Sequence, residues 1–253
     1  MKLFMGSVTS RVSPQWKFDT DNSGGGHTSV DSAFVLDDLL YIYSNRVPLD
    51  KNRPMLINEG NSGPIYVTNT HLAHELIILN TKQARLWARD VYQLAHELTH
   101  FVIFHGIQQL QFKWFEETLA ELSSYFFLKQ MAAYWVASNN PIKRAYADSF
   151  LDYVELERPE AEDIKMSDLS DPSSHTSLML ESYQYDRPKN NYIAQKILPV
   201  VEDNPAYWSA LPFLEKVSSA TSFLDFMAKW KAVSPKETRE ALSAVTSLFE
   251  SGR

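Results

Sequence analysis

The hydrophobic pattern changes its period near residue 81, and this change limits the folds that the chain can adopt. Before it, short apolar runs separated by Gly, Pro and polar residues predict the strands of a small sheet; these runs are residues 55–57, 65–67 and 76–79. After it, apolar residues recur at helical spacing: Leu86, Trp87, Val91, Leu94, Leu98, Phe101 and Val102. Gly106 follows where a C-terminal cap belongs. We therefore expect a small sheet followed directly by a long amphipathic helix.

Helical patterns also flank this region. Residues 32–45 have apolar side chains near helical spacing, and a second long helix is expected at about 114–137. The turn-rich residues 9–30 predict a loop, whereas Pro141 and Pro235 each stand where a helix can begin. We predict a mostly helical α+β fold with a small antiparallel sheet and an all-helical C-terminal half. It would form a single domain over 1–253, with 1–106 and 107–253 as sublobes.

Composition excludes several classes of protein. The chain has 253 residues, 44% of them hydrophobic, and no apolar run approaches the roughly 18 residues of a membrane span. Its net charge of −7 and the lack of a basic stripe argue against nucleic acid as a partner. It has no cysteine, so any metal must be held by His and carboxylates. With no secretory h-region at the N-terminus, we expect a cytoplasmic protein; the sequence leaves its oligomeric state open.

The segment His96-Glu97-Leu98-Thr99-His100 lies within the long amphipathic helix. At 3.6 residues per turn, two histidines four apart lie about 40° apart on one face and about 6 Å apart along the axis, so both can reach one ion. Glu97 points about 100° away from His96, toward a water beside the metal, whose proton it can accept. The pattern predicts a metal-dependent hydrolytic site; on these five residues alone, a surface histidine pair is the alternative.

A carboxylate cluster follows in the second predicted helix and makes the metal site the better interpretation. Glu116, Glu117 and Glu121 come after a connection short enough for the two helices to pack as an antiparallel pair. Helical spacing places Glu117 and Glu121 on one face. A third metal ligand is therefore available among these acids.

These two segments resemble the gluzincin peptidases, which carry H-E-x-x-H and a later glutamate ligand, often within W-x-x-E-G-x-A. Trp114, Glu117 and Ala120 match the second pattern. The resemblance covers residues 74–128 and implies a zincin-like fold, a Zn²⁺ cofactor and a peptide or protein substrate. It implies that His96, His100 and Glu117 are metal ligands, that Glu97 is the general base, and that Glu121 is an acid behind the ligands that orients a histidine. Glu121 or Glu116 could replace Glu117 as the third ligand, and we rank Glu117 above Glu121 and Glu121 above Glu116.

The chain departs from the family at several positions. Sixteen residues separate His100 from Glu117, slightly fewer than in the best-known members, and Thr118 replaces the usual glycine. The G-x-M-E-N signature of aminopeptidases is missing upstream, so that activity is not implied. A metzincin is excluded because it needs a third histidine where this chain has Gly106.

The resemblance also implies a donor that stabilises the transition state, from a residue well after the third ligand. Tyr192, at an expected helix start, is our choice among the alternatives, which are His175, Tyr183, Tyr185 and Arg187. In this family an extended peptide substrate pairs with the edge strand just before the motif helix. Glu75–Asn80 occupies that place in the sequence, and the alternative is that it forms an ordinary internal strand. His71, His74 and His27 are interpreted as loop or strand-edge residues.

Three functions compete at this stage. The first is a zinc metallopeptidase in which Glu97 activates water, and the second is a catalytically inactive zincin-like binding module. The third is a metal-free domain whose helices are held by Glu–His contacts. Glu97 favours the first, because a site that only binds metal needs no base there. Two acids facing two histidines also satisfy a cation better than they satisfy each other.

Overall fold

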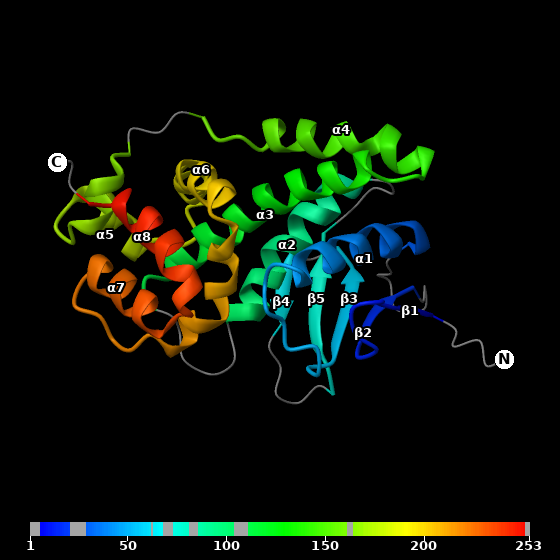
Figure 1. The fold of residues 1–253 in the computed structure, drawn as a ribbon, viewed down its shortest axis with the longest axis horizontal. Helices are drawn as coiled ribbons and strands as arrows, with labels where there is room; N and C mark the ends of the chain where they lie inside the picture. The colour runs from blue at the N-terminus through cyan, green and yellow to red at the C-terminus, as the bar shows by residue number, and fades with distance from the viewer. Residues whose placement is uncertain are drawn as a thin grey trace. The chain divides into compact units, whose positions relative to one another are not determined.

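The computed structural model describes residues 6–20, 29–61, 63–67, 73–80, 86–103, 111–160 and 164–250. Its N-terminal part alternates strands and helices: β1 (Ser7–Thr9), β2 (Trp16–Asp19), α1 (Val30–Ser44), β3 (Met55–Glu59), β4 (Ile65–Val67), β5 (Glu75–Leu79) and α2 (Trp87–Ile103). The remaining elements are helical: α3 (Lys113–Val136), α4 (Pro141–Leu156), η2 (Met166–Ser170), α5 (His175–Ser182), α6 (Arg187–Asp203), η3 (Pro205–Lys216), α7 (Phe223–Val233), η4 (Lys236–Thr238) and α8 (Arg239–Ser247). The predicted mostly helical α+β class is confirmed (Figure 1).

The sheet is mixed, so the predicted antiparallel sheet is wrong. Its strand order is β1-β2-β3-β5-β4, with β2, β3 and β5 parallel and the outer strands β1 and β4 antiparallel to their neighbours. The parallel pairing of β2 with β3 follows from α1, which lies between these two strands in the chain. A helical crossover returns the chain to the same end of the sheet, and the next strand then pairs in parallel.

The strand β2 lies in the segment 9–30 that the turn-rich composition predicted to be a loop, and β1 ends at its first residue. In β2, Trp16 and Phe18 are fully buried, while Lys17 between them is exposed. This alternation is the period of a half-buried strand, but it covers only four residues and is flanked by turn residues. The apolar side chains pack on the core face of the sheet, which overrides the local preference for a turn.

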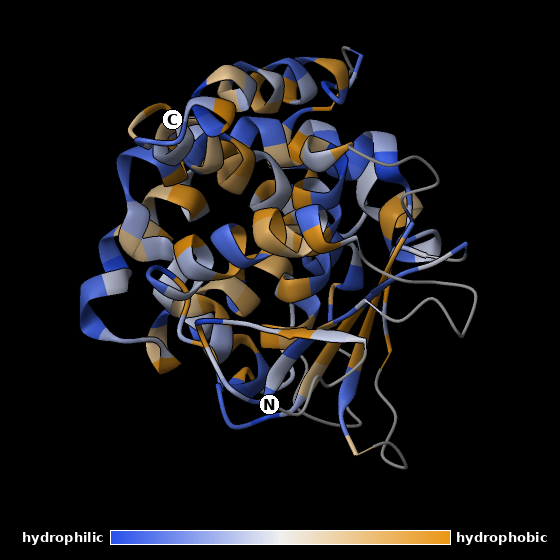
Figure 2. Ribbon diagram, turned by 90° about the vertical axis from the view of Figure 1, so that its right-hand side faces the viewer, coloured by the Kyte–Doolittle hydropathy of each residue, from blue (hydrophilic) through white to orange (hydrophobic). Residues whose placement is uncertain are grey.

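One face of the sheet forms a core layer. Phe18, Ile57 and Ile77 pair in register across β2, β3 and β5, and all three are completely buried. The intervening residues Leu56 and Ile78 are only half-buried. Figure 2 shows the apolar stretches along these strands. Burial with a period of two means that one face of the sheet carries the core.

The strand β5 is internal, because β3 pairs with one side of it and β4 with the other. Of the two interpretations of Glu75–Asn80, the internal strand is therefore correct, and β4 is the edge strand beside it. The turn before β4 requires glycine. Gly63 has φ +124°, and a Cβ atom there would lie 2.8 Å from the backbone oxygen of Ile78. Asn80 Nδ2 also donates to the Gly63 carbonyl at 3.0 Å.

Contacts divide the chain into two compact units. The first contains Met1–Asn45, Leu49–Phe101 and Phe127–Leu156, and therefore holds the sheet, α1, most of α2 and α4. The second contains Arg46–Pro48, Val102–Phe126 and Glu157–Arg253. Two of the boundaries between the units, after Phe101 and after Phe126, fall inside the helices α2 and α3 and not in loops. Among the described residues, no helix is long and apolar enough to cross a bilayer.

Candidate metal centre

The helix α2 presents the motif on its half-exposed side. Leu94, Ala95 and Leu98 are completely buried, while His96 and His100 remain half-buried. The two imidazole rings lie with centroids 5.0 Å apart and planes at 66°. The predicted placement of both histidines on one face is therefore confirmed.

Glu97 is buried among the core residues of α2. Only 4% of its surface is exposed, and its carboxylate makes no hydrogen bond or ion pair with any described residue. A glutamate is rarely buried to this degree in a protein unless it is paired or has a functional role. Such a group calls for an explanation, and a functional role is the common one.

Contacts with two other parts of the fold hold α2 around the motif. Gln93 exchanges two hydrogen bonds with the backbone of Asn80, at the end of β5, at 2.7 and 3.1 Å. The Thr99 hydroxyl lies 3.1 Å from the Tyr43 hydroxyl of α1 and donates to the Ala95 carbonyl at 3.0 Å. Because these contacts lie on both sides of residues 96–98, they fix the position of the motif along and around the helix axis.

Arg53 anchors the last turn of α2 to the sheet. Its Nη1 donates to the Phe101 carbonyl at 3.2 Å, and its guanidinium lies 4.2 Å from the centre of the Phe101 ring. The same guanidinium forms an ion pair with Glu75 and donates to the Tyr66 hydroxyl at 2.9 Å, and Tyr66 donates to Glu75. Burial and the neighbouring Glu75 carboxylate raise the pKa of Tyr66 well above its usual value, so the phenol stays protonated as a donor.

Replacing Arg53 with methionine is expected to destabilise the protein by about 2 kcal/mol, because Glu75 and Tyr66 lose a charged partner while they remain half-buried. Urea unfolding measures the change. Arg144 is the control, since it is exposed and donates one hydrogen bond, to Ser138 O; Arg144→Met is expected to change stability by less than about 0.5 kcal/mol. Equal effects of the two substitutions would contradict an anchoring role for Arg53.

The helix α3 carries the three candidate acids in its first three turns. Glu116 and Glu121 are buried, with side chains 3% and 5% exposed, whereas the Glu117 side chain is 12% exposed. Lys113 Nζ lies 2.7 Å from Glu116 and 3.6 Å from Glu117. Burial acts to lower the pKa of Lys113, but its ion pairs with Glu116 and Glu117 outweigh it and the net pKa is raised. Lys113 therefore stays charged beside these acids.

Among the described residues, one group of three side chains has metal-ligand chemistry in close proximity. Ligand atoms of His96, His100 and Glu117 all lie within 4.8 Å of one another. These are the three residues that the sequence ranked first as ligands. Neither Glu116 nor Glu121 belongs to this group, and each has a cationic neighbour of its own, Lys113 and Arg187 respectively.

The start of α6 lies along the same turns of α3. Arg187 Nε donates to Glu121 at 3.2 Å, and its Nη2 donates to Glu157 at 3.0 Å. The Thr118 hydroxyl lies 3.4 Å from the Asn190 side-chain oxygen, so Thr118 contacts α6. The chain segment that carries Tyr192 is therefore packed beside the turn of α3 that carries Glu117.

The other residues selected from the sequence have varied settings. Tyr192 is half-buried in the second turn of α6, with Lys196 Nζ 4.9 Å from its ring centre; its role stays a prediction. Tyr183 and Tyr185 are each 59% exposed, and His175 is an exposed first residue of α5. His74 is half-buried just before β5 and is not in the group of three. His27, His71 and Gly106 lie outside the described residues.

Several residues around the site were missed from the sequence. Lys113 has a local signal, because it stands three and four residues before Glu116 and Glu117, the spacing of helical ion pairs. Tyr43 and Arg53 have none, since their contacts with α2 join residues about fifty positions apart.

Comparison with protein-family models, with curated proteins and with solved structures finds no match to this chain.

Proposed function

We propose that this protein is a zinc-dependent metallopeptidase of zincin-like fold. One observation carries the proposal: Glu97, buried and without a described partner, is adjacent in α2 to a group of two imidazoles and a carboxylate whose ligand atoms lie within 4.8 Å. A structural role would require Glu97 to have a partner. A role as general base requires the opposite, a carboxylate free to accept a proton.

The donor set suits zinc better than the other common metals. Two imidazole nitrogens and one carboxylate oxygen are a known ligand set of catalytic zinc, whereas calcium and magnesium prefer oxygen ligands alone. Ligand atoms of tetrahedral zinc are roughly 3.3 Å apart. Separations of at most 4.8 Å for His96, His100 and Glu117 therefore need only small side-chain rotations to fit.

The remaining chemistry is assigned to the chain's own residues. Zinc, when bound, would polarise the scissile carbonyl and make a water acidic enough to attack at neutral pH. Glu97 accepts the proton of the attacking water and passes it to the leaving amine. Tyr192 is proposed to donate a hydrogen bond to the developing oxyanion. Glu121, which pairs with Arg187, is proposed to orient a ligand histidine.

The sheet supports a peptide as the substrate. The outer side of β4 is the edge of the five-stranded sheet, and its three residues are exposed or half-buried. An edge strand offers backbone donors and acceptors that can pair with an extended peptide. Such pairing holds the peptide backbone without demanding particular side chains, which fits a peptidase better than a small-molecule amidase.

The test is metal content together with peptide hydrolysis. Purified protein should contain one zinc per chain by inductively coupled plasma mass spectrometry, and should cleave a mixed peptide library with products identified by mass spectrometry. Removing zinc with a chelator should stop cleavage, and adding zinc back should restore it. Protein that binds no zinc after reconstitution would refute the proposal. Zinc binding without cleavage would favour the inactive binding module instead.

A further inference from the structure

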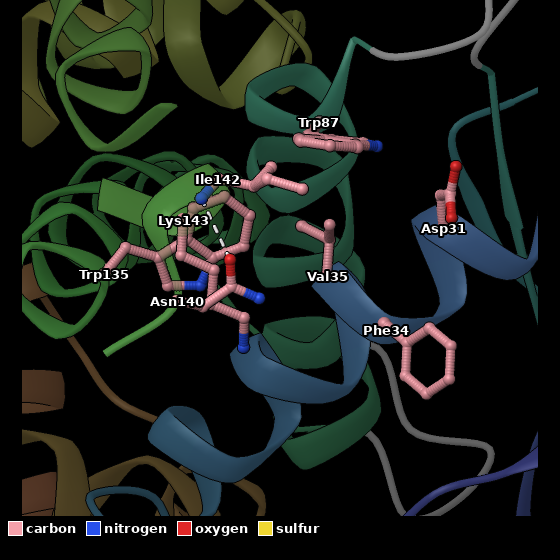
Figure 3. Close-up of a pocket in the computed structure, with 8 residues that line it drawn as sticks. All are labelled: Asp31, Phe34, Val35, Trp87, Trp135, Asn140, Ile142 and Lys143. Carbon is pink, nitrogen blue, oxygen red and sulfur yellow. Dashed lines mark hydrogen bonds between the residues drawn. The ribbon is translucent and has the colours of Figure 1, made fainter. Parts of the chain in front are cut away.

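A pocket lies within the first unit, between α1, the start of α2, the end of α3 and the start of α4. It has a volume of about 380 Å³, within the roughly 300–1,000 Å³ range of small-molecule sites. Figure 3 shows the side chains that line it: Asp31, Phe34, Val35, Trp87, Trp135, Asn140, Ile142 and Lys143. None of these residues belongs to the proposed zinc site, so the pocket calls for a separate explanation.

The pocket walls are mainly apolar and aromatic. Phe34 and Ile142 are 61% and 64% exposed, although both are large hydrophobic side chains. Trp87 packs at 6.0 Å from Trp135 and at 4.8 Å from Tyr146, measured between ring centres. These ring contacts hold the tryptophans in place, so the pocket is preformed. Apolar surface left exposed around a preformed pocket favours a ligand with an apolar body.

The positive charge in the wall is already neutralised. Lys143 forms an ion pair with Asp38, and its Nζ lies 5.6 Å from the centre of the Trp135 ring. Asp38 is 2% exposed and also accepts from Trp135 Nε1 at 2.8 Å and from Arg11 at 2.7 Å. Because Lys143 is held by this buried carboxylate, it does not make the pocket a site for anions.

The opposite side of the pocket carries a negative charge. Asp31 is an exposed residue in the first turn of α1, and its carboxylate makes no ion pair or hydrogen bond with any described residue. Figure 3 shows Asp31 across the pocket from Trp135 and Lys143, with Val35 and Trp87 between them. The helix dipole favours an acid at this position, but it does not supply a counter-ion.

We propose that this pocket binds a small organic cation whose ammonium group pairs with Asp31 and whose aromatic or branched aliphatic body lies between Val35, Trp87 and Ile142. Charge complementarity selects a cation, since Asp31, unlike Lys143, has no ion pair with any residue that the structure describes. The tryptophan rings add to this selection, because the face of an aromatic ring attracts cations. The proposal does not depend on zinc binding or on peptide hydrolysis.

The test uses 2-phenylethylamine as the probe and 2-phenylethanol as its neutral counterpart of the same shape. Binding is followed through the indole N–H resonances of Trp87 and Trp135 in nuclear magnetic resonance titrations. We expect a Kd of about 1 mM for the amine, as for a ligand of this size. The alcohol should bind about fivefold more weakly, because it cannot form the ion pair.

Variants separate the charge from the apolar wall. Asp31→Asn should remove the preference for the amine, Ile142→Ser should weaken both probes, and the control Asp152→Asn, on an exposed residue of α4, should leave both unchanged. Asp31 and Ile142 are exposed, so neither change should affect folding. Equal binding of amine and alcohol to the unaltered protein would overturn the proposal. It would also be overturned by an undiminished preference in Asp31→Asn, or by no shift of either indole resonance at about 10 mM amine.

Discussion

Replacing Glu97 with glutamine is expected to reduce kcat for peptide hydrolysis by about 10²- to 10⁴-fold while one zinc remains bound per chain. Glutamine has the shape of glutamate but cannot accept a proton at neutral pH, so only the base is removed. Initial rates on a peptide cleaved by the unaltered protein, measured with metal content on the same preparations, give the comparison. Glu240→Gln, at an exposed position of α8, is the matched control and should keep full activity.

The same substitution separates a catalytic from a structural role. Glu97 has no hydrogen bond or ion pair with any described residue, so replacing it with a neutral amide of the same shape should change the stability of the zinc-free protein by less than about 0.5 kcal/mol. A large loss of stability in Glu97→Gln, or unchanged hydrolysis with zinc bound, would contradict the assignment of Glu97 as the base.

Helix positions could be predicted from the sequence because helices depend on local spacing. The predictions at 32–45 and about 114–137 correspond to α1 (Val30–Ser44) and α3 (Lys113–Val136), and the apolar period after residue 81 gave α2. Pro141 begins α4, as its tolerance at the first helical position suggested. In each case the signal lies within one or two turns of the residues it describes.

Strand pairing could not be predicted in the same way. The three runs at 55–57, 65–67 and 76–79 do form β3, β4 and β5, but their order and direction depend on partners distant in sequence. β5 inserts between β3 and β4 instead of following β4 at the edge. A short connection between β3 and β4 suggests a hairpin, yet β4 pairs only with β5 among the described strands.

In the candidate site too, the locally determined features could be predicted and the tertiary contacts could not. His96, Glu97 and His100 follow from helical geometry, and the choice of Glu117 over its neighbours came from a family resemblance that agrees with the group of three ligand atoms within 4.8 Å. The contacts that hold the motif come from elsewhere in the fold, such as Tyr43 on α1. Their types are ordinary, and only the tertiary structure shows that they touch α2.

Replacing a proposed ligand is expected to remove the metal. His96→Ala and Glu117→Gln should each weaken zinc binding by more than about 100-fold, because orienting residues behind a zinc ligand already account for 10- to 100-fold and a direct ligand contributes more. Zinc content after dialysis, and competition with a chromogenic chelator, measure the loss. The zinc-dependent rise in thermal unfolding temperature should disappear in both variants, since a metal stabilises only the state that binds it.

The neighbouring acids provide the decisive controls. Glu116→Gln should keep zinc, because Glu116 pairs with Lys113 and lies outside the group of three ligand residues. His74→Ala should also keep zinc, because His74 lies outside this group. Glu121→Gln should weaken zinc binding by no more than about 10- to 100-fold, the effect of a residue that acts through a ligand. If Glu121→Gln lost all zinc while Glu117→Gln retained it, Glu121 would be the third ligand, and the proposed geometry of α3 would have to shift by one helical turn.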